Sequence, residues 1–363
     1  MAKDLLEKAR KEINEIDKEM AELFVRRMHA AEAVAEYKKE RGLAILDEAR
    51  ENEVIVRNSA FVSDETIREY YVNFLRDTMA TSRAYQARLM KGMKVAFSGT
   101  EGAFAHIAAC KLYPTAEKVS FGDFASAYRA VERGDCDVAV LPVENSYNGE
   151  VGQVTDLMFS GSLYVNGMFD LPITQDLLAK EGTKIEDIRE VVSHPQAFGQ
   201  CAEYINRHGF TRHEFANTAL AAKWVKDNPD RSVAAIGSRE AAEIFGLSVL
   251  DHDINENKKN STRFAIFSRV ANNRVACDSG VHSILLFTVR NEAGALAKAI
   301  DVIGQHGFNM RTLRSRPMKE LLWEYYFYVE TEGNIQSEKG TCLLESLSEF
   351  CDKLKFAGTY IKL

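Results

Sequence analysis

The chain is 363 residues long, enough for two or three domains of ordinary size. Hydrophobic residues make up 46% and charged residues 27%, which excludes a disordered, collagen-like or disulfide-scaffold chain. The net charge is −7 and no extended basic patch stands out, so we expect neither nucleic acid nor an anionic membrane as a partner.

Cysteine usage and the first residues indicate a cytoplasmic protein. The six cysteines have no metal-clip or redox-pair spacing, so we expect reduced thiols. They are Cys110, Cys136, Cys201, Cys277, Cys342 and Cys351. The N-terminus is charged from Lys3 onward and lacks an apolar signal core. No apolar run approaches the about 18–20 residues that a membrane span needs.

Residues 1–91 have the pattern of an all-helical domain. Neither proline nor glycine interrupts residues 4–41, and Asp4 and Gly42 suit the two ends of one very long helix. Two more helices are expected at 47–58 and 64–90, the latter capped by Ser63. Because the first helix is too long for two neighbours to cover, we expect a homodimer or a larger homo-oligomer.

Several polar side chains of this domain form a candidate set, of which Arg27 lies on the apolar stripe of the first helix. They are Arg10, Arg27, Lys38, Asp47, Arg50, Glu51, Ser82 and Gln86. Arg27 and Lys38 are 11 residues apart and point within about 20° of each other on a straight helix. Arg10 points about 100° away from Arg27, toward a different pocket. A single one of these side chains is most simply a solvated charge, but the whole set predicts an anion-binding pocket.

This set resembles the functional positions of the all-helical chorismate mutases, over about residues 4–90. The rearrangement of chorismate to prephenate needs no nucleophile, only a pocket that holds a compact dianion and stabilises charge on the ether oxygen. The resemblance implies that Arg27, Arg50 and Arg10 of the partner subunit bind carboxylates. It implies that Lys38 and Gln86 donate to the ether oxygen, Asp47 and Glu51 address the ring hydroxyl, and Ser82 lines the pocket.

Between residues 94 and 270, strand-like and helix-like segments alternate, which predicts an α/β region with largely parallel sheets. Strands are expected at 94–97, 138–143, 189–195 and 232–237, and helices at 123–133 and 218–227. Four motifs end a strand or begin a helix, where the sites of open α/β sheets lie. They are Pro142-Val143-Glu144-Asn145-Ser146, Ser193-His194-Pro195-Gln196, Asn217-Thr218-Ala219-Leu220-Ala221 and Asn260-Ser261-Thr262-Arg263-Phe264.

Taken singly, these motifs have simpler interpretations: Thr218 as a helix cap, His194 as a turn residue, and Arg263 as half of a structural ion pair. Together they resemble prephenate dehydratase over about residues 94–270. The resemblance implies two α/β lobes of the periplasmic-binding-protein type, with the substrate in the cleft. It implies that Thr262 donates a hydrogen bond to the departing hydroxyl of prephenate. Substrate contacts are expected from Glu144, Asn145, Ser146, His194, Thr218, Arg263 and Phe264.

One segment departs from that family. Its members usually have Gly-Pro-x-Gly followed by hydroxyl residues, but here the chain reads Gly99-Thr100-Glu101-Gly102-Ala103-Phe104-Ala105. Thr100 replaces the proline, and Ala103 and Ala105 remove two hydroxyl contacts. We expect an active dehydratase because Thr262-Arg263-Phe264 is intact. Two alternatives stay open: a dehydratase that accepts arogenate, and a second domain that senses such acids without turnover.

After a linker expected at 271–282, residues 281–363 follow a βαββαβ order. The elements are a strand at 283–290, a helix at 294–306, strands at 308–317 and 321–330, a helix at 336–354 and a strand at 356–361. This segment resembles the ACT domain, an amino-acid-binding regulatory module with a ferredoxin-like α+β fold. The resemblance implies phenylalanine bound at a dimer interface near Gly294, Ala295, Leu296 and Asn309, inhibiting the dehydratase. Arg314 replaces the glutamate of the family's Glu-Ser-Arg-Pro, which we expect to weaken or alter effector binding.

The sequence therefore predicts a multidomain, bifunctional enzyme of phenylalanine biosynthesis. An all-α chorismate mutase domain is expected at 1–91, an α/β prephenate dehydratase domain at 94–270 and an ACT domain at 281–363. The chain has no metal-ligand cluster and no dinucleotide or Walker motif, so we expect neither a metal nor an organic cofactor. The expected partners are chorismate, prephenate, phenylalanine and further copies of the chain.

Overall fold

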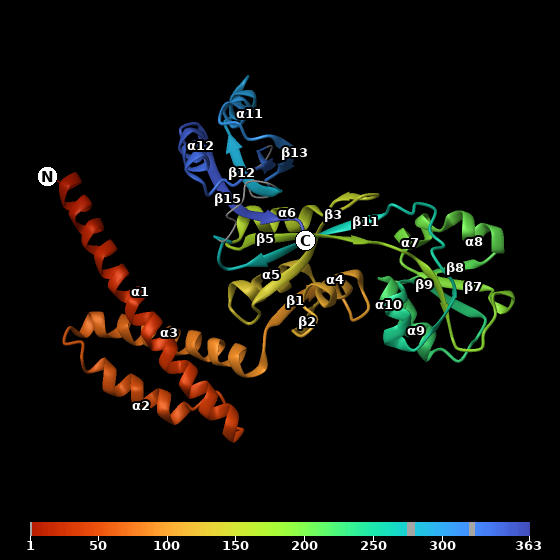
Figure 1. Cartoon of the computed structure of the whole chain (residues 1–363), viewed down its shortest axis with the longest axis horizontal. Helices are drawn as coiled ribbons and strands as arrows, with labels where there is room; N and C mark the ends of the chain where they lie inside the picture. Colours follow the sequence, from red (N-terminus) through yellow and green to blue (C-terminus); the bar gives the residue numbers. More distant parts are fainter. Residues whose placement is uncertain (1, 274–279, 319–323) are drawn as a thin grey trace. The chain divides into compact units, whose positions relative to one another are not determined.

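The computed structural model describes residues 2–273, 280–318 and 324–363, with side chains from residue 5 (Figure 1). The chain divides into two compact units, Met1–Met93 and Lys94–Leu363. Cys277 and half of the expected linker, residues 274–279, lie outside the described residues, and the other five cysteines are free thiols. No described helix is long and apolar enough to cross a membrane.

The first unit consists of three helices: α1 (Ala2–Arg41), α2 (Glu48–Ser59) and α3 (Glu65–Lys91). Each lies within two residues of its predicted bounds. Asp47 caps α2, and its Oδ1 accepts from the Arg50 N–H at 3.0 Å. The predicted Ser63 cap of α3 is wrong, because the Asp64 carboxylate accepts from the Ile67 N–H at 3.0 Å and takes that position.

The N-terminal half of α1 extends beyond α2 and α3 (Figure 1). Its apolar side chains stay in solvent: Ile13 is 55% exposed, Met20 43% and Leu23 58%. An apolar stripe of this length on an uncovered helix is typical of an association surface. The predicted homodimer would cover it, and the dimer stays a prediction.

The second unit begins with two α/β lobes. The first lobe has the strand order β2-β1-β3-β11-β5, with β4 beside β3. Its strands are β1 (Lys94–Ser98), β2 (Glu117–Phe121), β3 (Val138–Asn145), β4 (Gly149–Glu150), β5 (Tyr164–Pro172) and β11 (Ser261–Ser268). Its helices are α4 (Phe104–Leu112), α5 (Phe124–Glu132) and α6 (Gly152–Ser160).

The second lobe has the strand order β10-β6-β9-β7-β8. Its strands are β6 (Asp176–Ala179), β7 (Glu190–Ser193), β8 (Thr211–Glu214), β9 (Val233–Gly237) and β10 (Ser248–Asp251). Its helices are α7 (Pro195–Gln200), α8 (Ala202–His208), α9 (Thr218–Asp227) and α10 (Arg239–Phe245), with a 3-10 turn at Ile185–Asp187.

The chain crosses twice between the lobes, from β5 to β6 and from β10 to β11. The prediction of largely parallel sheets holds only in part: β1 pairs parallel with β2 and β3, and β7 with β8 and β9. The four strands next to the crossings pair antiparallel, so the sheets are mixed. The two-lobed α/β architecture is as predicted, with a cleft between the lobes.

The C-terminal sheet has the order β13-β14-β12-β15. Its strands are β12 (Val281–Val289), β13 (Met310–Pro317), β14 (Tyr325–Glu332) and β15 (Cys351–Ile361), with helices α11 (Ala295–Gln305) and α12 (Glu338–Ser348). This is the predicted ferredoxin-like βαββαβ fold. The predicted helix at 336–354 is too long, because Cys351 and the residues after it pair with β12, and this pairing extends the last strand.

The C-terminal sheet packs on the first lobe through one shared hydrophobic core. That core joins Val154 and Phe267 of the lobe to Ile284, Tyr326 and Tyr360 of the sheet. The end of β15 also reaches β5, where the Leu363 N–H donates to the Met168 carbonyl at 2.9 Å. The sheet is therefore built onto the lobe that carries β3 and β11.

Candidate functional sites

The three helices of the first unit enclose a cavity of about 170 Å³. Seven of the eight predicted mutase residues line it: Arg27, Lys38, Asp47, Arg50, Glu51, Ser82 and Gln86. Residues from all three helices and the α1–α2 turn thus come together. The periodicity argument therefore identified the correct helix faces.

Polar contacts hold these side chains toward the cavity. Arg27 donates to the Ser82 hydroxyl, and Lys38 donates to the Ile45 carbonyl. Gln86 is 7% exposed and its Oε1 accepts no hydrogen bond in the described part of the chain. Burial lowers the pKa of Arg27 from its ordinary value, although an arginine stays cationic. The pocket therefore offers fixed positive charge to an anionic ligand, and the Gln86 oxygen is free to accept from a donor group of that ligand.

Two residues differ from the prediction for this pocket. Arg10 lies on α1, 17 residues before Arg27, which places it about 25 Å away along the helix axis. It cannot reach the cavity of its own chain, and its role toward a partner subunit stays a prediction. Arg83 lines the cavity and pairs with Glu51, and it was missed. It shares the Met79, Ser82 and Gln86 face by i, i+3, i+4 spacing, so helix periodicity could have found it.

A larger cavity of about 490 Å³ lies between the two α/β lobes. The first lobe contributes Ala103, Phe104, Pro142, Asn145, Asn148, Gly149, Glu150, Val151 and Thr262. The second lobe and its crossing segments contribute Ile173, Gln175, His194, Gln196, Ala197, Gln200, Ala216, Asn217 and Thr218. Four predicted contacts, Asn145, His194, Thr218 and Thr262, are thus brought together from motifs far apart in the chain.

Asn145 and Thr262 form the polar centre of this cavity. They face each other across β3 and β11, and Asn145 Nδ2 donates to Thr262 Oγ1 at 2.9 Å. The same amide donates to Asn260 Oδ1 at 3.0 Å and to the Ser261 carbonyl at 3.2 Å. The Thr262 oxygen already accepts a hydrogen bond, so its own proton is free to point at a ligand.

The remaining predicted contacts of this site lie elsewhere. Side chains alternate between the two faces of a strand, so Arg263 points away from the cavity that Thr262 faces. It pairs with Asp170, with Nε 2.7 Å from Oδ1, and this confirms the simpler ion-pair interpretation. Phe264 is 1% exposed and belongs to the core. Neither residue lines the cavity, and their expected contacts with a substrate stay predictions.

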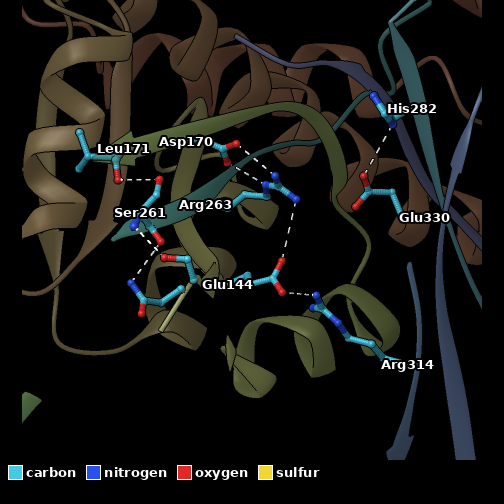
Figure 2. Close-up of polar contacts among 10 residues, drawn as sticks. Glu144, Asp170, Leu171, Ser261, Arg263, His282, Arg314 and Glu330 are labelled. Carbon is cyan, nitrogen blue, oxygen red and sulfur yellow. Dashed lines mark hydrogen bonds and ion pairs between the residues drawn. The ribbon is translucent and has the colours of Figure 1, made fainter. Parts of the chain in front are cut away.

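Glu144 and Ser146 also do not line the cavity. Glu144 pairs with Arg314 and lies 3.9 Å from Arg263 (Figure 2). The Ser146 hydroxyl accepts from the Ser261 N–H at 2.9 Å, which ties the end of β3 to the start of β11. The hydrogen bond from Arg263 lowers the pKa of Asp170. These residues therefore build the wall behind Thr262 and do not contact a ligand in the cavity.

The second lobe contributes to the cavity through the N-terminal ends of two helices, α7 and α9. The cap interpretation of Thr218 is wrong, because Asn217 caps α9 and accepts from the Leu220 N–H at 2.7 Å. Thr218 is the first helical residue and faces the cavity. His194 caps α7, where Nδ1 accepts from the Gln196 N–H at 3.2 Å. Thr100, which replaces the usual proline, donates across the cleft to Asn217 Oδ1 at 3.5 Å.

The lining residues of this cavity include neither lysine nor arginine. Instead, α4, α6 and α9 begin at it, and Ala103 and Val151 leave the first N–H groups of α4 and α6 without a side-chain cap. Helix N-termini carry partial positive charge and bind anions through such N–H groups. Loss of the expected hydroxyl at Ala103 thus leaves free backbone donors at the cleft.

Gln175 was missed by the sequence argument. It is 2% exposed, lies between β5 and β6, and lines the cavity. Its Nε2 donates to Gln200 Oε1 at 3.2 Å, while its own Oε1 has no partner in the described part of the chain. A free buried acceptor at the crossing point suits a donor group on a ligand. Nothing local in the sequence marks this glutamine.

A third cavity, of about 320 Å³, lies in the C-terminal sheet. Its lining residues are Val289, Arg290, Asn291, Glu292, Leu296, Ser315, Glu324, Tyr325 and Phe327. Of the four predicted effector residues only Leu296 lines it. Gly294 begins α11 with φ +86°, which favours glycine, and Asn309 donates to Glu332 Oε2 at 2.9 Å.

The first unit has a cationic helical pocket and the second a cleft between two α/β lobes, a combination that suits an enzyme with two sites for small organic acids. Residues 9–87 match the chorismate mutase type II family, and residues 95–272 match prephenate dehydratase. The chain belongs to the bifunctional chorismate mutase/prephenate dehydratases, and it carries an isomerase and a lyase domain.

Several similar proteins carry names that agree with this assignment. The bifunctional enzyme of Enterobacter agglomerans is 31% identical over 97% of this chain and 94% of its own length. An arogenate dehydratase/prephenate dehydratase of Arabidopsis thaliana is 32% identical, covering 89% of this chain and 87% of its own. The structure of an Arthrobacter aurescens prephenate dehydratase in complex with L-Phe has a TM-score of 0.68 at 26% identity, covering 74% of this chain and 90% of that one.

Proposed function

We propose that the chain converts chorismate to prephenate in the helical pocket and prephenate to phenylpyruvate in the inter-lobe cleft. In the first step Lys38 and Gln86 donate to the ether oxygen, while Arg27 and Arg50 hold carboxylates. The supporting observation is the cavity that gathers these side chains, among them the buried Gln86. Because the reaction is unimolecular, positioning and charge stabilisation are sufficient.

In the second step Thr262 donates a hydrogen bond to the departing hydroxyl. The observation that carries this role is the 2.9 Å contact from Asn145 Nδ2 to Thr262 Oγ1, which leaves the threonine proton free for a ligand in the cavity. An alcohol does not ionise, so it assists departure by hydrogen bonding while aromatisation drives the loss of carbon dioxide. The free N–H groups of α4 and α6 hold substrate carboxylates.

One assay tests the whole proposal. Purified protein is given chorismate, and the products are identified over time. Phenylpyruvate is the expected end product, with prephenate as an intermediate. Prephenate alone would refute the dehydratase half of the proposal, and the absence of both products would refute it entirely.

A second candidate substrate is arogenate, in which an ammonium group replaces the keto oxygen of prephenate. Two observations favour testing it: the name of the Arabidopsis relative, and the free acceptor oxygen of Gln175 in the cleft. An ammonium group can donate to that oxygen, whereas a keto group cannot. Comparing kcat/KM for prephenate and arogenate decides between them, and Gln175→Leu should penalise arogenate more.

The C-terminal sheet is proposed to be an ACT domain that binds phenylalanine and inhibits the dehydratase. Its βαββαβ order, the cavity beside Leu296 and the L-Phe complex of the Arthrobacter aurescens protein support this. Titrating phenylalanine against the dehydratase rate tests inhibition. A flat rate together with no heat of binding would refute the proposal.

A further inference from the structure

Two arginines of β13 reach from the C-terminal sheet to the wall of the dehydratase cavity. Arg314 donates to Glu144 Oε1, and Arg316 Nη1 donates to Glu150 Oε2 at 3.2 Å. Both carboxylates belong to the hairpin that β3 and β4 form. Figure 2 shows Arg314 meeting Glu144 close to Arg263.

The hairpin needs these cations. Glu144 and Glu150 are direct Cα partners across it, and like charges in that position destabilise a strand pair. The side chains of both pairs are only 19–33% exposed, so solvent screens them less than a surface ion pair. Arg316 Nε also donates to Asp156 Oδ1 at 2.9 Å. Its guanidinium lies directly against Gly152, where a Cβ atom would collide with it.

The β3–β4 hairpin, which these two arginines contact, carries Asn145, the residue that contacts Thr262. Asn145 is the residue after Glu144, and its Oδ1 accepts from the N–H groups of Tyr147 at 3.0 Å and Asn148 at 2.9 Å. Its Nδ2 donates to Thr262 Oγ1. A shift of the hairpin base therefore moves the amide on which the threonine proton depends.

The contact between Arg314 and Glu144 also connects to the strand of Thr262, through Arg263. Glu144 lies 3.9 Å from Arg263, and Arg263 is fixed by Asp170 on β5 (Figure 2). The hydrogen bond that Arg263 donates to Asp170 raises the pKa of Arg263, so this guanidinium is a permanent cation. Glu144 thus bridges one cation from the C-terminal sheet and one from the residue beside Thr262.

We propose that Arg314 and Arg316 are positioning residues of the dehydratase, which hold the β3–β4 hairpin so that Asn145 orients Thr262. The proposal rests on the proposed role of Thr262. A glutamate at position 314 would face Glu144 as a like charge, so the contact depends on the arginine. Ser315, between the two arginines, points to the opposite face and lines the C-terminal cavity. A ligand there contacts the strand that carries the two arginines.

The test compares Arg314→Met, Arg316→Met and the double variant with a matched control. Arg311→Met is that control, because Arg311 lies on the same strand but pairs with Glu332 inside its own sheet. We expect the double variant to lose about tenfold or more in dehydratase kcat, as misplaced groups do. KM for prephenate should stay within about twofold, because neither arginine lines the cavity.

Three further readouts separate positioning from folding. The chorismate mutase rate of each sample reports the active concentration and should not change. Arg314→Lys should recover most of the loss in Arg314→Met, because it restores the charge on Glu144. In a double-mutant cycle, Glu144→Gln with Arg314→Met should be no slower than Glu144→Gln alone.

Three results would each refute this positioning role. They are wild-type kcat in the double variant, a loss equal to that of Arg311→Met, and additive losses in the double-mutant cycle. Should the double variant unfold, Gly152→Ala displaces the Arg316 guanidinium without changing any charge, and a wild-type kcat there overturns the proposal as well. Failure of the proposed function has a different signature, since Thr262→Val would then remain active. If the wild type is active, Thr262→Val is inactive and the Arg314/Arg316 double variant is unaffected, only the positioning role of the two arginines is refuted.

Discussion

Replacing Thr262 by valine removes one hydroxyl and keeps the shape of the side chain. Asn145 Nδ2 then loses one acceptor but retains Asn260 Oδ1 at 3.0 Å and the Ser261 carbonyl at 3.2 Å. One lost hydrogen bond costs about 1 kcal/mol of folding free energy. For a unit of this size that lowers Tm by only about 2–4 °C, so the variant should fold.

The expected effect on catalysis is much larger. A donor aimed at a departing hydroxyl acts mainly in the transition state, and removing such a donor costs about 2.7–4 kcal/mol, or about 10²–10³ in kcat. Phenylpyruvate formation from prephenate measures this rate, and the mutase rate of the same sample gives an internal measure of active protein. Thr262→Ser keeps the hydroxyl and should retain most of the activity.

The result that would refute the reasoning is equally specific. If Thr262→Val keeps kcat within about threefold of wild type, the hydroxyl does not act in the transition state. If Thr262→Val stays active while Thr262→Ser loses activity, packing of the methyl group matters and the donor does not. Either outcome would shift attention to Gln175, the other polar group of the cleft with a free atom in the described structure.

Three more predictions concern other parts of the chain. Lys38→Ala should lower mutase turnover by about 10²-fold or more and leave the helical circular-dichroism signal and the dehydratase rate intact; near wild-type turnover would contradict the assignment. If Arg10 serves the pocket of a partner subunit, mixing Arg10→Ala with Lys38→Ala chains should restore about a quarter of the mutase rate, since half the dimers carry one complete site; no recovery would contradict a shared site. Burial lowers the pKa of His282 below its ordinary 6.5, so the fold prefers the neutral ring and the unfolded chain takes up the proton first as pH falls. Tm should therefore fall from about pH 7 to pH 5.5, and the fall should be smaller in His282→Phe, which keeps the stacking on Tyr360.

Local pattern was sufficient where the structure depends on neighbours in sequence. The long run of residues without proline or glycine located α1, and the i, i+4 spacing of Ser82 and Gln86 put both in the cavity. Prediction failed where contacts between residues far apart in the chain determine the local structure. Residues 351–354 look helical, but pairing with β12 makes them a strand.

The dehydratase cleft shows the same division. The motifs located Asn145 and Thr262, yet the argument ignored strand alternation and therefore assigned Arg263, the next residue, to the substrate as well. Gln175 enters the cleft only because the chain crosses between lobes at that point. Glu144 was expected at the substrate, but its partner Arg314 comes from the C-terminal sheet, which no local pattern connects to β3.

The two candidate sites bind dianions by different means, and this gives a last prediction. The chain has a net charge of −7, so each site needs local attraction for an anion. The mutase cavity supplies it with formal charges. Its lining includes the cations Arg27, Lys38, Arg50 and Arg83 and the anions Asp47 and Glu51, a net of 4 − 2 = +2. The lining of the dehydratase cavity has no arginine or lysine and presents helix N-termini instead.

Salt should distinguish these two mechanisms. The screening length falls from about 10 Å at 0.1 M to about 3 Å at 1 M ionic strength, which weakens attraction by formal charges at a distance. Short hydrogen bonds from backbone N–H groups depend less on that range. KM for chorismate should therefore rise more steeply with sodium chloride than KM for prephenate, each measured with its own substrate supplied directly. Equal dependence of the two KM values on salt would mean that a cation outside the described lining holds the carboxylates of prephenate. Arg263 would then be the first residue to test, because it is the charged residue adjacent to Thr262.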